Sequence, residues 1–104
     1  MKGDSYMPEM PDDKTLDKME SLLNIASDFT RLKILYAISD GDKNVGEIVT
    51  ETGASQSLVS HQLNVLKKAH LVSTRKEGTK VYYRLSDEHV TKLLEVVHEH
   101  VLEE

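Results

Sequence analysis

The chain has 104 residues, enough for one domain with a single core but too few for two. Its 18 acidic and 13 basic residues give a net charge of −5, a total that by itself argues against nucleic-acid binding. The absence of cysteine excludes disulfides, thiolate metal sites and a cysteine nucleophile. No apolar run reaches the roughly 18 residues of a membrane span, and the first 11 residues lack the apolar stretch of a signal peptide. We therefore expect a cytoplasmic protein with no membrane partner.

The first part of the chain predicts a loose tail followed by two helices. Residues 1–13 contain Gly3, Pro8 and Pro11 without a periodic apolar pattern, and we interpret them as a flexible N-terminal tail. From Lys14 onward, apolar residues recur at the helical spacings of three and four, at Leu16, Met19, Leu22, Leu23 and Ala26. A second helix is expected to begin near Asp28 and to end at the turn residues 39–42, with an apolar face of Leu32, Leu35 and Ile38.

Two more predicted helices have a glycine between them. Asn44 can cap the third helix, with Glu47 placed as in a capping box, and Gly53 ends it. Ser55 can cap the fourth helix, whose buried stripe would be Val59, Leu63 and Leu66. Two helices joined by a tight glycine turn form a helix-turn-helix.

The rest of the chain has the pattern of a β-hairpin followed by a last helix. Two β-prone runs, residues 71–75 and 80–85, flank a turn that contains Gly78. A hairpin directly after a helix-turn-helix is a winged helix. We therefore predict a mainly α fold with a β-hairpin wing, in one domain over residues 14–104. Ser86 can cap the last helix, whose apolar positions are Val90, Leu93, Leu94, Val97 and Val101.

Basic charge is concentrated in the predicted recognition helix and wing. Residues 53–84 contain six bases and one acid, a net charge of +5, whereas residues 86–104 have a net charge of −5. Bases in this segment would lie against DNA phosphates. A solvated face with an accidental asymmetry is the alternative, and the coincidence with the helix-turn-helix favours DNA. Candidate DNA contacts are Gln56, Ser57, Ser60, His61 and Asn64 on the exposed face of the fourth helix, with Lys76, Lys80 and Arg84 in the wing.

Four side chains of the last helix are candidate metal ligands: Asp87, His89, His100 and Glu103. The two histidines are 11 residues apart, about three helical turns, so they point to nearly the same face but lie roughly 16 Å apart. One helix cannot bring both to one ion. Two antiparallel copies would bring Asp87 and His89 of one chain to His100 and Glu103 of the other, and symmetry would create two identical sites. Asp87 and His89 diverge on an ideal helix, so their convergence needs an irregular first turn.

The donor set of two imidazoles and two carboxylates favours tetrahedral Zn(II), with Co(II) or Ni(II) as substitutes. A solvated acidic helix is the alternative that the residues alone leave open. Glu95 and His98 form a competing pair that we assign to the surface.

The chain resembles the ArsR/SmtB family of bacterial metal-responsive repressors over about residues 14–103. Three segments carry the resemblance: residues 28–35, residues 56–63, which are typical of the family's recognition helix, and residues 70–72 leading into the Gly78 wing. The spacing of the four candidate ligands is similar to that of the zinc-sensing branch, whose site is shared between the C-terminal helices of two subunits. Other branches bind arsenic, cadmium or lead through cysteines, and this chain has none.

The resemblance implies a homodimeric repressor that binds an imperfect inverted repeat in operator DNA and is released by zinc. It also implies that the first and last helices form the dimer interface. In this branch the ligand matching His100 is linked to the backbone at the end of the recognition helix, where His70 lies.

Three other functions compete with a zinc-responsive repressor. A winged-helix regulator that senses no metal would use the last helix only for dimerisation. A metal-dependent hydrolase would need an open metal position, which four protein ligands do not leave, so we do not expect an enzyme. A dimeric interaction module would not explain the basic wing.

Overall fold

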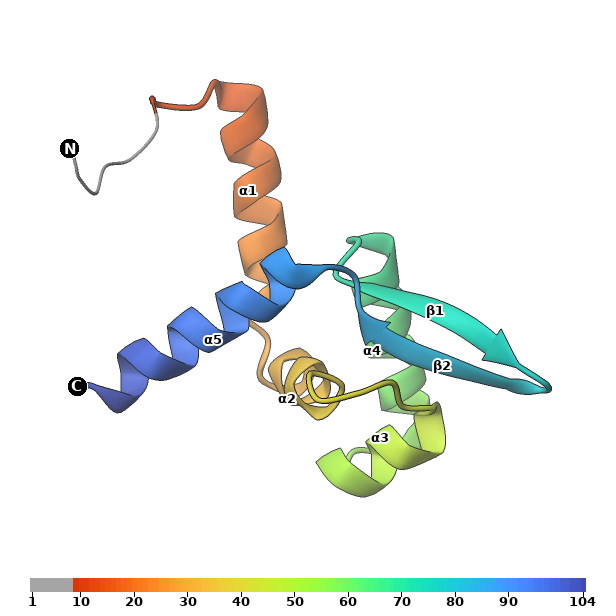
Figure 1. Ribbon diagram of the computed structural model, residues 1–104. Helices are drawn as coiled ribbons and strands as arrows, with labels where there is room; N and C mark the ends of the chain where they lie inside the picture. Colours follow the sequence, from red (N-terminus) through yellow and green to blue (C-terminus); the bar gives the residue numbers. More distant parts are fainter. Residues whose placement is uncertain (1–8) are drawn as a thin grey trace.

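The winged helix-turn-helix is seen in the computed structural model, which describes residues 9–104 (Figure 1). Those residues form five helices and one two-stranded antiparallel hairpin. The elements are α1 (Asp13–Ala26), α2 (Phe29–Ala37), α3 (Val45–Thr52), α4 (Gln56–Lys68), β1 (Val72–Glu77), β2 (Lys80–Leu85) and α5 (Glu88–Leu102). None of these helices is long and apolar enough to cross a membrane.

The N-terminal boundary differs slightly from the predicted one. The prediction of a tail over residues 1–13 falls largely on residues 1–8, which lie outside the described residues. Residues 9–12 have no regular structure, but Asp13 is already the first residue of α1. The helix begins there because the Asp12 carboxylate caps it, accepting a hydrogen bond from the Thr15 N–H at 2.8 Å.

Helices α2, α3 and α4 begin where the sequence predicted, and α3 and α4 have the predicted caps. Asp28 caps α2 by accepting a hydrogen bond from the backbone N–H three residues later, at 3.0 Å. Asn44 and Glu47 form a reciprocal capping box at α3, with both bonds at 2.9 Å. Ser55 caps α4. Gly53, with φ of 75°, ends α3 in a left-handed conformation that glycine adopts without steric cost.

The cap of α5 is Asp87, so the prediction of Ser86 was wrong by one residue. The Ser86 N–H donates to the Leu71 carbonyl at 3.0 Å, which keeps this residue in the extended end of the hairpin. The helix therefore starts one residue later. Asp87 is extended, and its Oδ1 accepts hydrogen bonds from the N–H groups of His89 at 2.9 Å and Val90 at 3.2 Å.

The core is aliphatic and forms around α4. The predicted stripe of Val59, Leu63 and Leu66 is completely buried. It packs in one cluster with residues of α2, α3, the hairpin and α5, among them Ile34, Leu35, Ile48, Val72 and Leu94. Burying each such side chain stabilises a fold by about 1.5–3 kcal/mol, so the stripe fixes the rotation of α4.

One polar side chain of α4 also faces inward. Gln62 is buried, and its Oε1 accepts a hydrogen bond from Arg31 Nε at 2.6 Å. Because Arg31 lies in α2, this bond ties the recognition helix to the preceding helix. Gln62 is therefore unavailable to DNA, although it lies between the candidate contacts Ser60 and Asn64 in sequence.

The hairpin is attached to the body through the segment between α2 and α3. The strands pair from Val72 opposite Leu85 to Glu77 opposite Lys80. Gly78 has a φ of 65°, as the first position of a tight two-residue hairpin turn requires. Lys43 forms a backbone bridge to Tyr83, with N–H···O distances of 3.1 and 2.8 Å. The base of the wing is thereby fixed relative to the helix-turn-helix.

The end of α4 has an unusual backbone conformation. His70 has a φ of 63°, and it is the one non-glycine residue among residues 9–104 with a positive φ. Its N–H donates to the Lys67 carbonyl and the Leu71 N–H to the Leu66 carbonyl, both at 3.0 Å, which is the Schellman arrangement. Glycine is usual at this position, and a left-handed conformation costs other residues roughly 1–2 kcal/mol.

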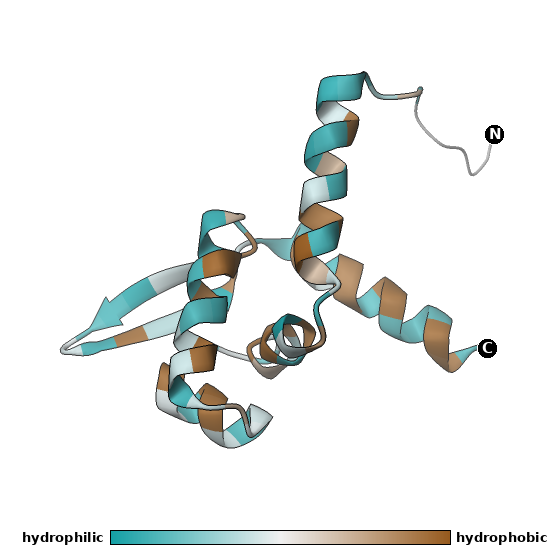
Figure 2. Cartoon of the chain, turned by 180° about the vertical axis from the view of Figure 1, so that it is seen from behind, coloured by the Kyte–Doolittle hydropathy of each residue, from teal (hydrophilic) through white to brown (hydrophobic). Residues whose placement is uncertain are grey.

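Helices α1 and α5 have apolar faces that the rest of the chain does not cover. Helix α1 contains no buried residue, and α5 buries only Val90 and Leu94. Val97 and Val101, both predicted as apolar positions of the last helix, are 48% and 55% exposed. Both helices project from the body, and brown apolar segments are visible along α5 in Figure 2. Tyr36 of α2 holds α5 by donating from its hydroxyl to the Leu94 carbonyl at 2.6 Å.

We expect His70→Gly to raise the free energy of unfolding by up to about 1 kcal/mol, because glycine relieves the left-handed strain at some entropic cost. His70→Val should lower it by more than 1 kcal/mol, since a β-branched residue tolerates positive φ poorly. Urea denaturation at one fixed protein concentration measures both. Equal stability of the two variants would contradict the Schellman assignment.

Candidate nucleic-acid interface and metal ligands

The exposed face of α4 presents a stripe of polar side chains. At 100° per residue, Ser57, His61, Asn64 and Lys68 lie opposite the buried stripe, and all four are exposed. Gln56 and Ser60 are also exposed, at the side of this stripe. The structure therefore places all five predicted α4 contacts on the surface. Lys68 was not among the predicted contacts, although its spacing of four residues from Asn64 could have indicated it.

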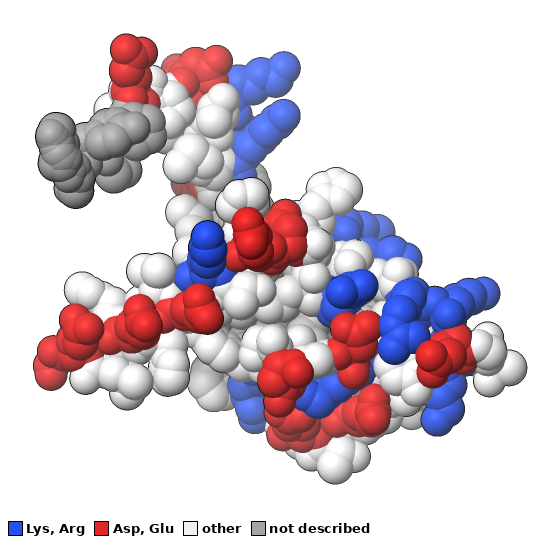
Figure 3. All heavy atoms as spheres, in the orientation of Figure 1, with Lys and Arg blue, Asp and Glu red and all other residues white. Residues whose placement is uncertain are grey.

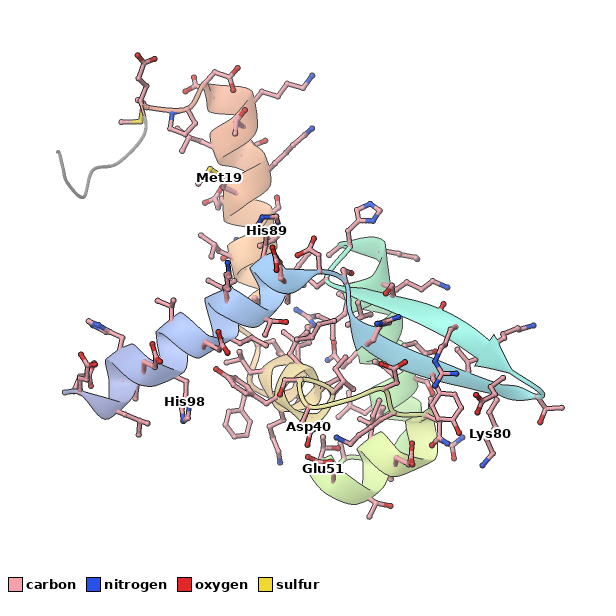
Figure 4. All side chains as sticks on the ribbon, in the orientation of Figure 1. Met19, Asp40, Glu51, Lys80, His89 and His98 are labelled. Atoms are coloured by element: carbon pink, nitrogen blue, oxygen red, sulfur yellow. The ribbon has the colours of Figure 1, made fainter. Side chains whose placement is uncertain are left out.

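The two wing lysines lie on opposite faces of the hairpin. Lys76 is paired with Val81 and Lys80 with Glu77, and successive side chains of a strand point to opposite faces. Both lysines are exposed, and neither takes part in an ion pair within residues 9–104. Figure 4 shows Lys80 near the free end of the hairpin. Both ammonium groups are therefore available to phosphates on either side of the wing.

The wing arginines have carboxylate partners. Arg75 Nε lies 2.8 Å from Asp42 Oδ2, and its Nη1 lies 3.1 Å from Glu77 Oε2. These two carboxylates raise the pKa of the Arg75 guanidinium further above its usual range, Asp42 contributing most. Arg84 Nε lies 3.8 Å from the other oxygen of Asp42. Arg84 was predicted as a DNA contact and is exposed, but it shares Asp42 with Arg75, a residue outside the predicted set.

The distribution of charge follows the elements. In Figure 3, blue atoms gather over the hairpin with red atoms among them, while red atoms follow the projecting α5. The acids of α5 are exposed: Glu88, Glu95 and Glu99, followed by Glu103 at its C-terminal cap. The wing is thus electrically distinct from the C-terminal helix.

Asp87 and His89 converge at the start of α5. The N-cap conformation takes Asp87 off the helical path, so that its Oδ1 lies 3.5 Å from His89 Nδ1. The irregular first turn needed for these residues to act together is therefore present. Their side chains are 55% and 88% exposed, respectively, and Figure 4 shows His89 at the end of α5 that lies beside α1.

His100 and Glu103 lie at the opposite end of α5, and both are exposed. Among residues 9–104, no group of three or more His, Cys, Asp or Glu side chains is close enough to hold a metal ion. One chain therefore does not bring the four predicted ligands together. His98, the other histidine on this part of α5, packs edge-on against the Tyr36 ring, with centroids 6.1 Å apart.

The first pair of candidate ligands adjoins the end of the recognition helix. Asp87, His89 and His70 line one open surface depression together with Ala69 and Val90. No hydrogen bond between residues 9–104 uses the His70 carbonyl oxygen. A group bound at Asp87 and His89 would thus lie in the depression that His70 also lines at the end of α4.

Comparisons with known proteins identify the family to which the chain belongs. Residues 28–74 match the family model described as bacterial regulatory protein, arsR family. The chain is 35% identical to the HTH-type transcriptional regulator KmtR of Mycobacterium tuberculosis, over 90% of this chain and 72% of that protein. It is 32% identical to the transcriptional repressor SmtB homolog of Synechocystis, over 92% of this chain and 73% of that protein.

A solved structure shares the fold. It is a homodimeric winged helix-turn-helix DNA-binding domain from Mycobacterium bovis, described as a possible ArsR-family transcriptional regulator. The TM-score is 0.81 and the identity 33%, over 93% of this chain and 92% of that one.

Replacing Ser57 and His61 together by alanine should reduce operator affinity to the level of random DNA. Both side chains lie on the outward stripe of α4, where each good base contact contributes about 1–3 kcal/mol of discrimination. Fluorescence anisotropy with operator and random duplexes measures the ratio of the two affinities. Unchanged operator affinity in a folded double variant would contradict the assignment of α4.

Lys76→Ala and Lys80→Ala should each weaken binding to all DNA sequences alike. Each removes about one phosphate contact per protomer, so the salt dependence of the affinity should become shallower by about one charge per protomer. Lys14→Ala, at the exposed start of α1 and far from the wing, is the matched control. A sequence-selective loss would argue against a phosphate role for the wing lysines.

Proposed function

Because this chain belongs to the ArsR/SmtB family of bacterial transcriptional regulators, we propose that it is a zinc-responsive repressor. It binds operator DNA as a homodimer and leaves the operator when Zn(II) is held between the two subunits. The convergence of Asp87 and His89 at the start of α5 is the observation that carries the metal part of this proposal.

The DNA-binding part is supported by the exposed stripe of α4 and by the wing. Ser57, His61 and Asn64 present hydrogen-bonding groups to a major groove, and Gln56 and Ser60 reach the flanking backbone. Lys76 and Lys80 supply charge without an ion-pair partner among the described residues. The family assignment supports a transcriptional regulator rather than an enzyme.

The homodimer is supported by the uncovered faces of α1 and α5. An open groove between these helices has an almost wholly apolar lining. It includes Leu23, Leu32, Leu93, Leu94 and Val97. A chain of this size buries too little surface to leave such a face in water without cost. The similar Mycobacterium bovis domain is homodimeric, and the same association would cover this groove.

The chemistry of the candidate ligands fits zinc. Asp87 and His89 form an exposed half-site, and His100 and Glu103 are an i, i+3 pair that can chelate together. In an antiparallel pair of α5 helices, each half-site would meet the complementary half-site of the partner. When bound, Zn(II) would join the two helices at both ends, and Co(II) or Ni(II) could substitute for it.

The proposed coupling to DNA runs through His70. A ligating imidazole normally donates its free N–H to a nearby acceptor. His70 lines the same open depression as the Asp87–His89 half-site, and its carbonyl accepts no hydrogen bond from residues 9–104. A bond from His100 of the opposite chain to this carbonyl would fix the end of α4, and the two recognition helices would no longer span the operator. Because the acceptor is backbone, His70→Ala should retain the coupling.

A regulator that senses no metal is the alternative. The capping bonds of Asp87 and the apolar face of α5 would explain this helix as a dimerisation element alone. Zinc titration against operator binding separates the two functions, since only a sensor loses DNA affinity as zinc is added.

His89→Ala and His100→Ala homodimers should each lose tight zinc binding and stay on DNA in the presence of zinc. A forced heterodimer of the two variants should bind one zinc, because one of its two sites recombines all four intact ligands. The wild-type dimer should bind two. Competition with a chromophoric chelator measures the stoichiometry.

His98→Ala is the matched control, since this α5 histidine packs against Tyr36 and is not among the proposed ligands. It should keep two zinc ions per dimer. A heterodimer without a tight site would refute the shared arrangement and leave α5 as a dimerisation helix.

A further inference from the structure

Asp42 joins the wing to the segment between α2 and α3 by ion pairs. The backbone bridge between Lys43 and Tyr83 sets Asp42 next to Arg84. Each carboxylate oxygen of Asp42 faces a different arginine, Arg75 at 2.8 Å and Arg84 at 3.8 Å. The Asp42 side chain is 26% exposed, against 42% for Arg75 and 57% for Arg84, so the carboxylate is the most shielded of the three side chains.

Arg75 is held on three sides. Besides Asp42, it contacts Glu77 at 3.1 Å, and its guanidinium lies 4.7 Å from the centre of the Tyr82 ring. A planar guanidinium matches carboxylates and aromatic faces at the same time, which fixes its position more firmly than an ammonium group. The position of the Arg75 guanidinium is therefore set by Asp42, Glu77 and Tyr82.

These pairs change the charge that the wing offers to DNA. Two arginines and two carboxylates, Asp42 and Glu77, have no net charge as a group. Sequence-independent affinity for DNA arises almost entirely from bases that neutralise phosphates and release counterions. An arginine already paired with a carboxylate releases fewer counterions, because reaching a phosphate requires breaking that pair.

We propose that Asp42 is a specificity-determining residue that holds the wing arginines back from non-operator phosphates. This proposal rests on the DNA-binding function proposed above. On random DNA, where the protein takes many positions, released arginines would add contacts wherever a phosphate is near. On the operator, α4 fixes the position of the protein, so fewer of these contacts are available. Asp42 thus lowers affinity for random DNA more than affinity for the operator.

The test compares Asp42→Asn with wild type on two duplexes of equal length, the intergenic DNA upstream of the gene and a random sequence. Asparagine keeps the shape of the side chain and removes its charge. Random-duplex affinity should rise roughly fivefold per protomer at 0.15 M salt, and its salt dependence should steepen by about one charge per protomer. The ratio of operator to random affinity should fall.

Asp40→Asn is the matched control. Asp40 lies in the same turn, is 79% exposed and pairs with Lys43 rather than with a wing arginine. It removes the same charge from the same region, and Lys43 keeps its contact with Glu51 at 3.2 Å. A change shared by both variants would reflect net charge alone and would overturn the proposal.

A double variant distinguishes an effect of released positive charge from an effect of a less firmly held wing. Adding Arg75→Gln to Asp42→Asn should return the salt dependence to the wild-type value, because the extra positive charge is removed. Weaker binding of Asp42→Asn to both duplexes, without a steeper salt dependence, would instead show that Asp42 only stabilises the position of the wing. That result would refute the proposal.

The two proposals fail in different ways. If wild type binds both duplexes equally, the repressor function fails for this operator, while the random duplex alone still tests Asp42. If wild type discriminates but Asp42→Asn behaves like Asp40→Asn, only the role of Asp42 is lost.

Discussion

The complete burial of one face of α4 is the constraint on which the rest of the structure depends. Val59, Leu63 and Leu66 can reach the core in only one rotation of the helix, so the polar stripe opposite them must face outward. The bond between Arg31 and Gln62 holds the same rotation from the side. The geometry of a possible DNA contact is thus set by aliphatic packing, and the polar residues themselves contribute little to it.

Local chemistry in the sequence was enough to predict the helices, the hairpin and most of the caps. Asp28, Asn44 and Ser55 act on backbone groups three residues away, and such short-range bonds are visible in sequence. The start of α5 was misplaced because the Ser86 N–H is taken by Leu71, a contact between residues 15 positions apart. His70 was recognised as the end of α4, but nothing in its residue type required a positive φ.

The same difference between local and long-range contacts decided which features of the candidate site could be predicted. Side-chain exposure on α4 follows from helical periodicity, so all five predicted contacts lie at the surface. The partners of Arg84 did not follow from sequence, because Asp42 is 42 positions away from it. The basic segment consequently offers DNA less unpaired charge than its composition suggested. The convergence of Asp87 and His89 likewise depended on a backbone conformation that periodicity could not supply.

The order of the elements has a consequence for how the protein is made. Most of the core comes from the contiguous segment Phe29 to Leu85, to which α5 adds Val90 and Leu94. Helix-rich segments fold quickly, and the N-terminal part of a chain folds first during synthesis. The helix with the candidate ligands is the last element of the described chain to leave the ribosome. A nascent subunit is therefore expected to have a formed recognition helix before it can associate or bind metal, so its assembly would follow its translation.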